Sequence, residues 1–314
     1  MQIVVLDGYS VNPGDVDWAP LKKLGTLSVY DRTHPSMIEQ RMRGADAVFV
    51  NKVQLTREIL YKARKLSFIG ELATGYDNID IEAARERKIT VCNVPTYCTE
   101  SVAQLTAAMM LELSQHTAHM DHLVHKGCWT ASPDFCYWDN APLLLCGKTL
   151  GIIGIGRIGS KVALIGKALG MHVIGTGRSP RPDFPGEQRP MHEIFESSDI
   201  ITLHCPANAA SIGMINRKTI ESMKDGVLLI NTSRGSLLNE SDVAEALKSG
   251  KMGGCAVDVV SSEPISKSNP LLAAPNCLIT PHYAWAPVPV RQKLIDIAAA
   301  NLAAFLNGSP INTL

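Results

Sequence analysis

Three glycines near the middle of the chain, Gly154, Gly156 and Gly159, form the pattern GxGxxG. An apolar run, Leu150 to Ile153, precedes them, and a helical pattern follows. Between a strand and a helix this spacing is typical of a turn that binds a dinucleotide, because the backbone can approach a pyrophosphate and the helix N-terminus supplies N–H groups. A tight turn without a ligand does not need all three glycines. The residues expected at the cofactor in this turn are Gly154, Gly156, Arg157, Ile158 and Gly159.

Short apolar runs alternate with helical patterns along the chain, which is typical of parallel sheets covered by helices. One series of strands reaches about Pro95, and a second begins at Thr149. At 314 residues the chain also exceeds the usual size of one domain. We therefore expect an α/β fold with a Rossmann-type doubly wound parallel sheet and a second, flavodoxin-like α/β domain. The expected strands are Ile3–Leu6, Leu27–Tyr30, Ala47–Val50, Leu66–Leu72, Thr149–Ile153, His172–Gly175, Ile200–His204, Val227–Asn231, Cys255–Val259 and Cys277–Thr280.

Helical patterns fill the intervals between the first strands. A long helix after them is predicted to begin with a capping box of Ser101 and Gln104, and a closing helix is predicted over residues 290–305. Residues 127–142, rich in aromatic and turn residues, predict an extended loop. Its Trp129 and Trp138 could line a site or a subunit contact, and the sequence leaves both open. The helices expected in the first series are Asp17–Leu24, Pro35–Arg43 and Thr56–Ala63.

Composition narrows the choice of partners. Lys and Arg together number 30, as do Asp and Glu, so no net charge attracts nucleic acid or an anionic membrane. The start of the chain lacks a basic leader, and no segment approaches the ~20 apolar residues of a membrane helix. Eight scattered cysteines without a CxxC pair favour reduced thiols over a zinc or redox site. We therefore expect a cytoplasmic protein whose partner is a small metabolite.

Four histidines recur every three residues, at His116, His119, His122 and His125, and suggest a metal site at first sight. A step of three residues covers about 300° of an α-helix, so the row drifts by about 60° per step and only neighbours share a face. A solvated helix surface is the preferred interpretation, and we expect no metal.

The end of the second strand of the nucleotide-binding sheet lacks the acid that usually holds the ribose hydroxyls of the adenosine. Gly177 stands where the carboxylate is expected, and Arg178 and Ser179 follow it. This segment would accommodate a 2′-phosphate, so the sequence predicts NADP(H) in preference to NAD(H), with all three residues at the cofactor. In the alternative interpretation Arg178 points to solvent.

Polar residues follow the fourth, fifth and sixth strands of the same sheet: Arg234, Glu263 and His282. Open parallel sheets bind ligands outside the carboxyl ends of their strands. A guanidinium can grip a carboxylate and polarise a carbonyl, and an imidazolium held by a carboxylate can protonate the oxygen as hydride reaches carbon. Singly, the three could be a surface cation, a loop acid and a capping group. Together they predict hydride transfer between a nicotinamide dinucleotide and carbon 2 of a small 2-keto or 2-hydroxy acid.

Several motifs in order along the chain resemble those of the D-isomer-specific 2-hydroxyacid dehydrogenases, and the match spans nearly the whole sequence. The resemblance implies that Arg234 binds the substrate and polarises its carbonyl, that Glu263 is the partner of the histidine, and that His282 is the acid/base. It also implies a homodimer joined through the nucleotide-binding domains. The implied domains are 1–98 with 287–314 for the substrate and 99–286 for the dinucleotide. The matching segments are residues 151–159, 231–235, 256–259, 263–264 and 280–282.

The resemblance implies further contacts. The loop Ala73–Tyr76 is similar to the family segment whose backbone amides bind the substrate carboxylate. Asp258, inside an apolar strand, either serves the nicotinamide end of the pocket or bonds neighbouring backbone. The residues implied at the substrate are Ala73, Thr74, Gly75, Arg234 and Trp285. Those implied at the cofactor are Thr106, Cys205, Pro206, Thr232, Asp258 and His282.

Within the family, Asn51–Lys52, the Ala73–Tyr76 loop and His282–Trp285 look like the glycerate dehydrogenase (hydroxypyruvate reductase) branch. The expected substrates are hydroxypyruvate, glyoxylate or a similar short 2-keto acid. The missing acid at Gly177 departs from the NAD-preferring pattern, and NAD stays open as the cofactor. Two other functions also stay open: a dinucleotide-sensing binding protein on the same fold, and a phosphoglycerate dehydrogenase.

Overall fold

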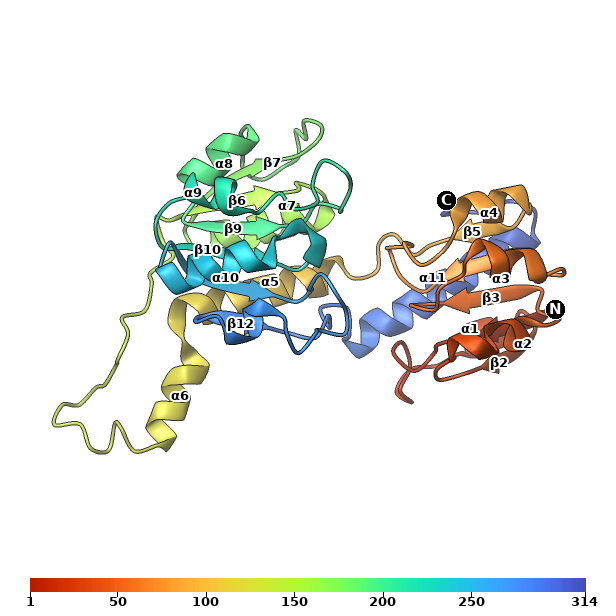
Figure 1. The fold of residues 1–314 in the computed structure, drawn as a ribbon, viewed down its shortest axis with the longest axis horizontal. Coiled ribbons are helices and arrows are strands. Elements are labelled where there is room, and N and C mark those ends of the chain that lie inside the picture. Colours follow the sequence, from red (N-terminus) through yellow and green to blue (C-terminus); the bar gives the residue numbers. More distant parts are fainter. The chain divides into compact units, whose positions relative to one another are not determined.

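The computed structural model describes all residues from 1 to 314, which form two compact units (Figure 1). The first unit consists of Met1–Cys98 and Trp285–Leu314, and the second of Thr99–Ala284. We expected the second boundary after residue 286. Trp285 belongs instead to the first unit, where it packs against the hydrophobic core.

Five parallel strands form the sheet of the first unit, in the order β2-β1-β3-β4-β5. The sequence patterns did not indicate β5, which has only three residues, or α4, a helix of six residues. The strands are β1 (Gln2–Val5), β2 (Thr26–Val29), β3 (Ala47–Val50), β4 (Phe68–Glu71) and β5 (Thr90–Cys92). The helices are α1 (Ala19–Lys22), η1 (Pro35–Met37), α2 (Ile38–Met42), α3 (Arg57–Lys62), α4 (Ile81–Glu86) and α11 (Val288–Leu306).

The C-terminal helix α11 completes the core of the first unit. Its Leu294, Ala298 and Leu302 are buried in the cluster that also holds Phe68 of β4. Arg291 of α11 is buried as well, and each of its two terminal nitrogens lies 2.6 Å from a carboxylate oxygen of Asp15. The two ends of the chain are therefore joined in one unit by apolar packing and by a bidentate ion pair.

Seven parallel strands form the sheet of the second unit, in the order β12-β11-β10-β9-β6-β7-β8. Strand order reverses between β6 and β9, so the carboxyl ends of these two strands mark the topological switch point of a doubly wound sheet. The strands are β6 (Thr149–Ile153), β7 (His172–Thr176), β8 (Glu187–Gln188), β9 (Ile200–Leu203), β10 (Val227–Asn231), β11 (Met252–Val257) and β12 (Cys277–Ile279). The helices are α5 (Thr99–Gln115), α6 (Thr117–His125), α7 (Arg157–Ala168), α8 (Met191–Ser197), α9 (Arg217–Glu221), η2 (Gly235–Leu237), α10 (Glu240–Ser249) and η3 (Pro270–Ala273).

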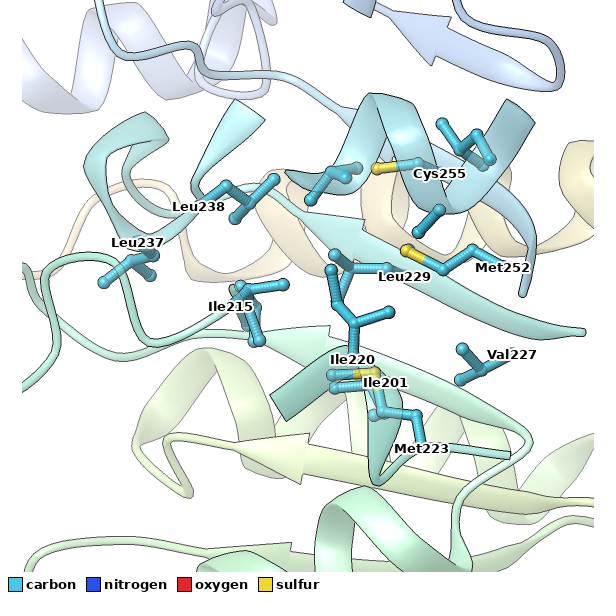
Figure 2. Close-up of a cluster of buried hydrophobic side chains, with 14 of the residues drawn as sticks. Ile201, Ile215, Ile220, Met223, Val227, Leu229, Leu237, Leu238, Met252 and Cys255 are labelled. Carbon is cyan, nitrogen blue, oxygen red and sulfur yellow. The ribbon is translucent and has the colours of Figure 1, made fainter. Parts of the chain in front are cut away.

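Both faces of this second sheet are covered. Along β10, Leu229 belongs to one buried cluster and Leu228 and Ile230 belong to the other, as the alternation of side chains in a strand requires. Figure 2 shows the first cluster, in which Leu229 lies near Ile220 of α9. Full burial on two sides explains why the central strands are continuous apolar runs. The structure thus confirms the α/β class and the doubly wound sheet.

Two details of the long helices differ from the sequence prediction. Helix α5 begins at Thr99, so Ser101 is a buried residue within the helix and does not cap it. His116 adopts a left-handed conformation with φ of 51° and separates α5 from α6, so the four histidines do not share one helix. The chain contains no group of three or more His, Cys, Asp or Glu side chains that could hold a metal ion. None of the helices combines the length and the apolar character that crossing a bilayer requires.

Candidate active site

The glycine turn lies between β6 and α7, at the carboxyl end of a central strand. Gly154 has φ of 103°, and a Cβ there would lie 2.5 Å from the carbonyl carbon of His204. A Cβ at Gly159 would overlap the carbonyl oxygen of Gly154. A Cβ at Gly156 would meet no protein atom within 4 Å. The protein's own packing therefore requires the first and third glycines but not the second, which fits a turn that leaves space for a dinucleotide.

The segment after β7 explains the missing acid in steric terms. A Cβ at Gly177 would lie 2.7 Å from Cγ1 of Ile155, a buried side chain, so no larger residue fits there unless Ile155 moves. Arg178 and Ser179 are exposed, and the Arg178 guanidinium has no ion-pair partner in the chain. An exposed guanidinium without an ion-pair partner therefore follows β7, and its contact with a 2′-phosphate stays a prediction.

Other residues expected at the cofactor lie at the ends of the neighbouring strands. The hydroxyls of Thr106, on α5, and Thr232, just after β10, are 3.0 Å apart and buried. Cys205 and Pro206 follow β9, and burial raises the pKa of the Cys205 thiol. These positions share one edge of the sheet with the glycine turn, because the strands are parallel.

His204, at the end of β9, was not singled out from the sequence. Both of its ring nitrogens are buried and have no hydrogen-bond partner, and desolvation lowers the pKa of the ring to about 3. The imidazole is therefore neutral at physiological pH. The sequence analysis took His204 as the last residue of the expected strand Ile200–His204, whereas β9 ends at Leu203, so His204 is a polar residue beyond a strand end, as Arg234 is.

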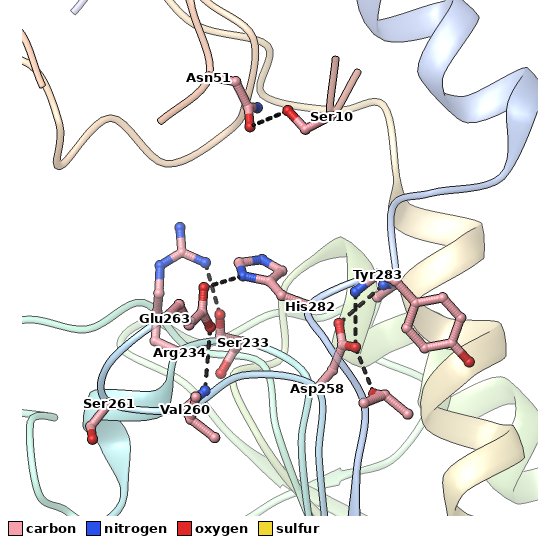
Figure 3. A network of polar contacts seen from close by, with 12 residues as sticks. Ser10, Asn51, Ser233, Arg234, Asp258, Val260, Ser261, Glu263, His282 and Tyr283 are labelled. Atoms are coloured by element: carbon pink, nitrogen blue, oxygen red, sulfur yellow. Dashed lines mark hydrogen bonds and ion pairs between the residues drawn. The ribbon is translucent and has the colours of Figure 1, made fainter. Parts of the chain in front are cut away.

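The histidine and the carboxylate predicted to act together do form a pair. Nδ1 of His282 lies 2.6 Å from Oε2 of Glu263, with 29% and 34% of the two side chains exposed. Figure 3 shows Arg234 beside this pair, with the imidazole turned toward the carboxylate. The chemistry available is therefore that of a proton donor or acceptor next to a cationic group.

The backbone around His282 is held in a rare conformation. His282 has φ of 51°, a left-handed value that is uncommon for a residue other than glycine. The buried Asp258 accepts hydrogen bonds from the backbone N–H groups of Tyr283 and Ala284, each at 3.0 Å, and from the Thr280 hydroxyl at 2.6 Å. Of the two uses considered for Asp258, bonding to neighbouring backbone is observed, and contact with nicotinamide stays a prediction.

The turn that carries Arg234 is built by Asn231, the last residue of β10. The Asn231 amide donates to the carbonyl of Arg234 at 2.7 Å and accepts from the N–H of Ser233 at 3.0 Å. Nη1 of Arg234 donates to the carbonyl of Ser233 at 2.8 Å. A Cβ at Gly235 would overlap the backbone of Val260, so this turn lies directly against the loop that carries Glu263.

In the first unit, the loop after β4 presents unpaired backbone donors. The carbonyl oxygens of Ala73 and Thr74 accept hydrogen bonds from Val94 and Asn93, and the Thr74 hydroxyl donates to the Val94 carbonyl. The N–H groups of Ala73, Thr74 and Gly75, in contrast, have no acceptor in the chain. Three successive free N–H groups on a loop pinned by its carbonyls are suited to an anion such as a carboxylate.

Glu71, the last residue of β4, directly precedes this loop. Its side chain is fully buried, and the sequence patterns did not single it out. Its Oε2 accepts a hydrogen bond from the Asn78 amide at 3.0 Å, whereas Oε1 has no partner. Burial raises the pKa of Glu71 to about 9, so the side chain is protonated at neutral pH. A neutral carboxyl avoids repulsion between Glu71 and an anion bound at the loop.

Sequence comparisons find relatives that cover nearly the whole chain. The family model "D-isomer specific 2-hydroxyacid dehydrogenase, NAD binding domain" matches residues 107–284. A hydroxypyruvate reductase of Blautia hydrogenotrophica is 46% identical, and the alignment covers 100% of this chain and 99% of that protein. A glycerate dehydrogenase of Methylorubrum extorquens is 36% identical over 89% of this chain and 88% of its own.

Solved structures of similar fold include proteins bound to either nicotinamide dinucleotide. A D-lactate dehydrogenase of Aquifex aeolicus, complexed with NAD and lactic acid, has a TM-score of 0.85 and 30% identity, over 98% of this chain and 96% of that one. An acyclic imino acid reductase (Bsp5), in complex with NADPH and D-arginine, has a TM-score of 0.87 and 28% identity over the whole of both chains. Likeness of fold therefore does not distinguish the two cofactors.

Proposed function

Because the chain belongs to the D-isomer specific 2-hydroxyacid dehydrogenase family, we propose that it reduces hydroxypyruvate, or a similar short 2-keto acid such as glyoxylate, at carbon 2. Family membership makes the chain an NAD(P)-dependent oxidoreductase. The observation that carries the proposed chemistry is the 2.6 Å contact between His282 and Glu263 beside Arg234. The other possibility considered, a dinucleotide sensor without activity, has no observation in its favour.

The roles of the three side chains follow from their chemistry. When bound, the nicotinamide dinucleotide supplies hydride to carbon 2 of the substrate, or accepts it in the reverse direction. The His282 imidazolium gives a proton to the carbonyl oxygen, so an N–H bond breaks as an O–H bond forms. The Glu263 carboxylate orients the ring through its contact with Nδ1. The Arg234 guanidinium binds the substrate carboxylate and polarises the carbonyl.

The Ala73–Gly75 loop is the second proposed ligand of the substrate carboxylate, because its three N–H groups lack acceptors. Trp285 is proposed at the substrate as well. At the cofactor we propose the glycine turn together with Gly177, Arg178, Ser179, Thr106, Cys205, Pro206, Thr232, Asp258 and His282. The two units then take the roles of a substrate domain and a dinucleotide-binding domain.

We propose NADPH as the preferred cofactor, because an unpaired Arg178 replaces an acid that the packing of Ile155 excludes.

We also propose a homodimer. The segment after α6 exposes large aromatic side chains that a second copy would cover: 50% of Trp129, 91% of Phe135 and 62% of Trp138 are accessible. Light scattering during gel filtration would give the molar mass in solution and so test the proposed dimer. None of the eight cysteines forms a disulfide, which favours a reducing compartment such as the cytoplasm.

The decisive experiment is a panel of 2-keto acids assayed with NADPH and NADH in parallel. The panel holds hydroxypyruvate, glyoxylate, pyruvate and phosphohydroxypyruvate, and the configuration of the product is determined by chiral chromatography. We expect the highest kcat/KM for hydroxypyruvate with NADPH and a D-configured product. A preference for phosphohydroxypyruvate would contradict the substrate, and a lower KM for NADH than for NADPH would contradict the cofactor.

A further inference from the structure

We propose that Glu240 is a positioning residue for the reaction, which holds the loop Val260–Glu263 so that the Glu263 carboxylate meets His282. The proposal rests on the roles proposed above for Glu263 and His282. It assigns a function to a carboxylate that lies outside the site described so far, at the first residue of α10.

The contacts of Glu240 are directed at the loop. Its Oε1 accepts the backbone N–H of Ser261 at 2.7 Å, and its Oε2 accepts the Ser261 hydroxyl, also at 2.7 Å. Oε2 accepts a third hydrogen bond, from the amide of the buried Asn269, at 3.0 Å. The carboxylate therefore binds both a backbone and a side-chain donor of Ser261, and charge-assisted bonds of this length are about twice as strong as neutral ones.

The loop is exposed and irregular. Ser261, Ser262, Glu263 and Pro264 are all exposed, and they belong to no helix or strand. The N–H of Val260 donates to Oε1 of Glu263 at 3.3 Å, which links the base of the loop to the carboxylate that it carries. A fixed Ser261 therefore restricts the positions of its neighbours Val260 and Ser262, and Ser262 leads directly to Glu263.

Glu240 also joins this loop to the turn that carries Arg234. The short segment from Arg234 to Glu240 touches the loop twice: Gly235 lies against the backbone of Val260, and the Glu240 carboxylate binds Ser261. The same short segment therefore positions the Arg234 guanidinium and also contacts the loop that carries Glu263, the partner of His282. Displacement of the loop would disturb their relative positions, and a misplacement of about 1 Å can lower a rate by about 10²-fold.

A purely local role in the helix does not account for these contacts. Acids in a first helical turn are favoured by the helix dipole, but Asn239 already caps α10 by accepting the N–H of Asp242 at 3.3 Å. Both oxygens of Glu240 are bonded to residues outside the helix, at sequence separations of 21 and 29 residues. The carboxylate thus connects α10 to the loop and to η3.

The test compares Glu240→Ala with Glu245→Ala, which removes an exposed acid from the same helix, paired with Arg217. For Glu240→Ala we expect kcat for hydroxypyruvate to fall roughly tenfold to hundredfold, while KM and the Kd of NADPH change little. Glu240→Gln should show a smaller loss, because its carbonyl oxygen can still accept from the Ser261 hydroxyl and the Asn269 amide, whereas its NH2 group cannot accept from the Ser261 N–H. Glu245→Ala should retain parental kinetics. If Glu240→Ala does not fold, Glu240→Gln takes its place with the same readouts.

A double-mutant cycle with Glu263→Gln separates the possible outcomes. If Glu240 acts through Glu263, the double variant is no slower than Glu263→Gln alone, because the carboxylate to be positioned is already gone. Multiplied losses, or a Glu240→Ala enzyme with unchanged kcat, would overturn the positioning role while leaving the proposed catalysis intact. Parental activity of Glu263→Gln would instead overturn the role of Glu263 and the present proposal with it.

Discussion

At the scale of single residues, His282 combines the two properties that the proposed proton transfer needs. It is paired with a carboxylate on one ring nitrogen, and its backbone is held by Asp258 in a conformation that few side chains adopt. Replacement by alanine should lower kcat about 10²- to 10⁴-fold, the usual contribution of a general acid, with little change in the Kd of NADPH. His192→Ala, on an exposed face of α8, is the control. Near-parental turnover of His282→Ala would remove the role.

Glu71 predicts how the stability of the first unit depends on pH. Folding raises its pKa from 4.5 to about 9, so between these values the folded protein retains a proton that the unfolded chain releases. The free energy of unfolding should therefore decrease as pH rises through this window. Glu71→Gln cannot ionise and should have a higher Tm than the parent at pH 8, but a similar Tm at pH 4.5.

Thermal unfolding followed by circular dichroism across pH 4.5–8.5 measures this effect. Glu82→Gln, which changes an exposed acid of α4, should keep the parental pH dependence. A parallel pH dependence in Glu71→Gln and the parent would show that Glu71 ionises normally.

Arg178 is the residue that should decide between the two cofactors. Arg178→Ala should raise the KM of NADPH roughly tenfold or more, the effect of one hydrogen-bonded charge. It should leave the KM of NADH nearly unchanged. Arg189→Ala is a suitable control, because that guanidinium is already paired with Glu187 and Glu193. Equal effects on both cofactors would place Arg178 away from the 2′-phosphate.

At the scale of elements, the turn between β6 and α7 contains one glycine that packing requires, Gly159, and one that only ligand binding is expected to require, Gly156. Gly156→Ala adds a methyl group where the protein has no atom within 4 Å, so Tm should change little while the Kd of NADPH rises. Gly159→Ala adds one against the Gly154 carbonyl and should destabilise the protein by about 1–3 kcal/mol. Calorimetry of unfolding and of binding measures both. An unchanged Kd in Gly156→Ala would contradict the close approach of a ligand.

How much of an element could be predicted depended on its burial. Strand β10 is apolar over four successive residues because both of its faces are covered, and its bounds match the prediction. Strand β8, Glu187–Gln188, is an exposed pair at the sheet edge and carries no apolar signal. The start of α5 was misplaced, because Ser101 and Gln104 fit a capping box although the helix begins two residues earlier.

The residues of the candidate site also differ in how far the sequence alone could reveal them. Arg234, Glu263 and His282 were predictable because parallel strands bring their carboxyl ends to one edge. The buried Glu71 lay within a predicted strand, where the apolar pattern of its neighbours concealed it. The contact between Glu240 and Ser261 joins residues 21 positions apart, and neither spacing nor composition reveals which loop a helix start will touch.

At the scale of the whole molecule, the first unit is assembled from both ends of the chain and the second is continuous. Deletion of residues 288–314 removes α11, and with it Leu294, Ala298 and Leu302 from the first core. We expect this variant to lose keto acid reduction and amide protection in the first unit, while the second unit still binds NADPH. Hydrogen exchange and calorimetric titration distinguish the two. Loss of NADPH binding on this deletion would contradict the independence of the second unit.

The packing of Ile155 against Gly177 bears on how this enzyme could change over evolutionary time. A carboxylate at position 177 is the common means of recognising the ribose of NAD, but a single substitution there would force a side chain into Ile155. The intermediate with one change would be impaired before the second change made room. Placing a carboxylate at position 177 therefore requires two coordinated mutations, which gives protein engineers a defined pair of positions to vary together.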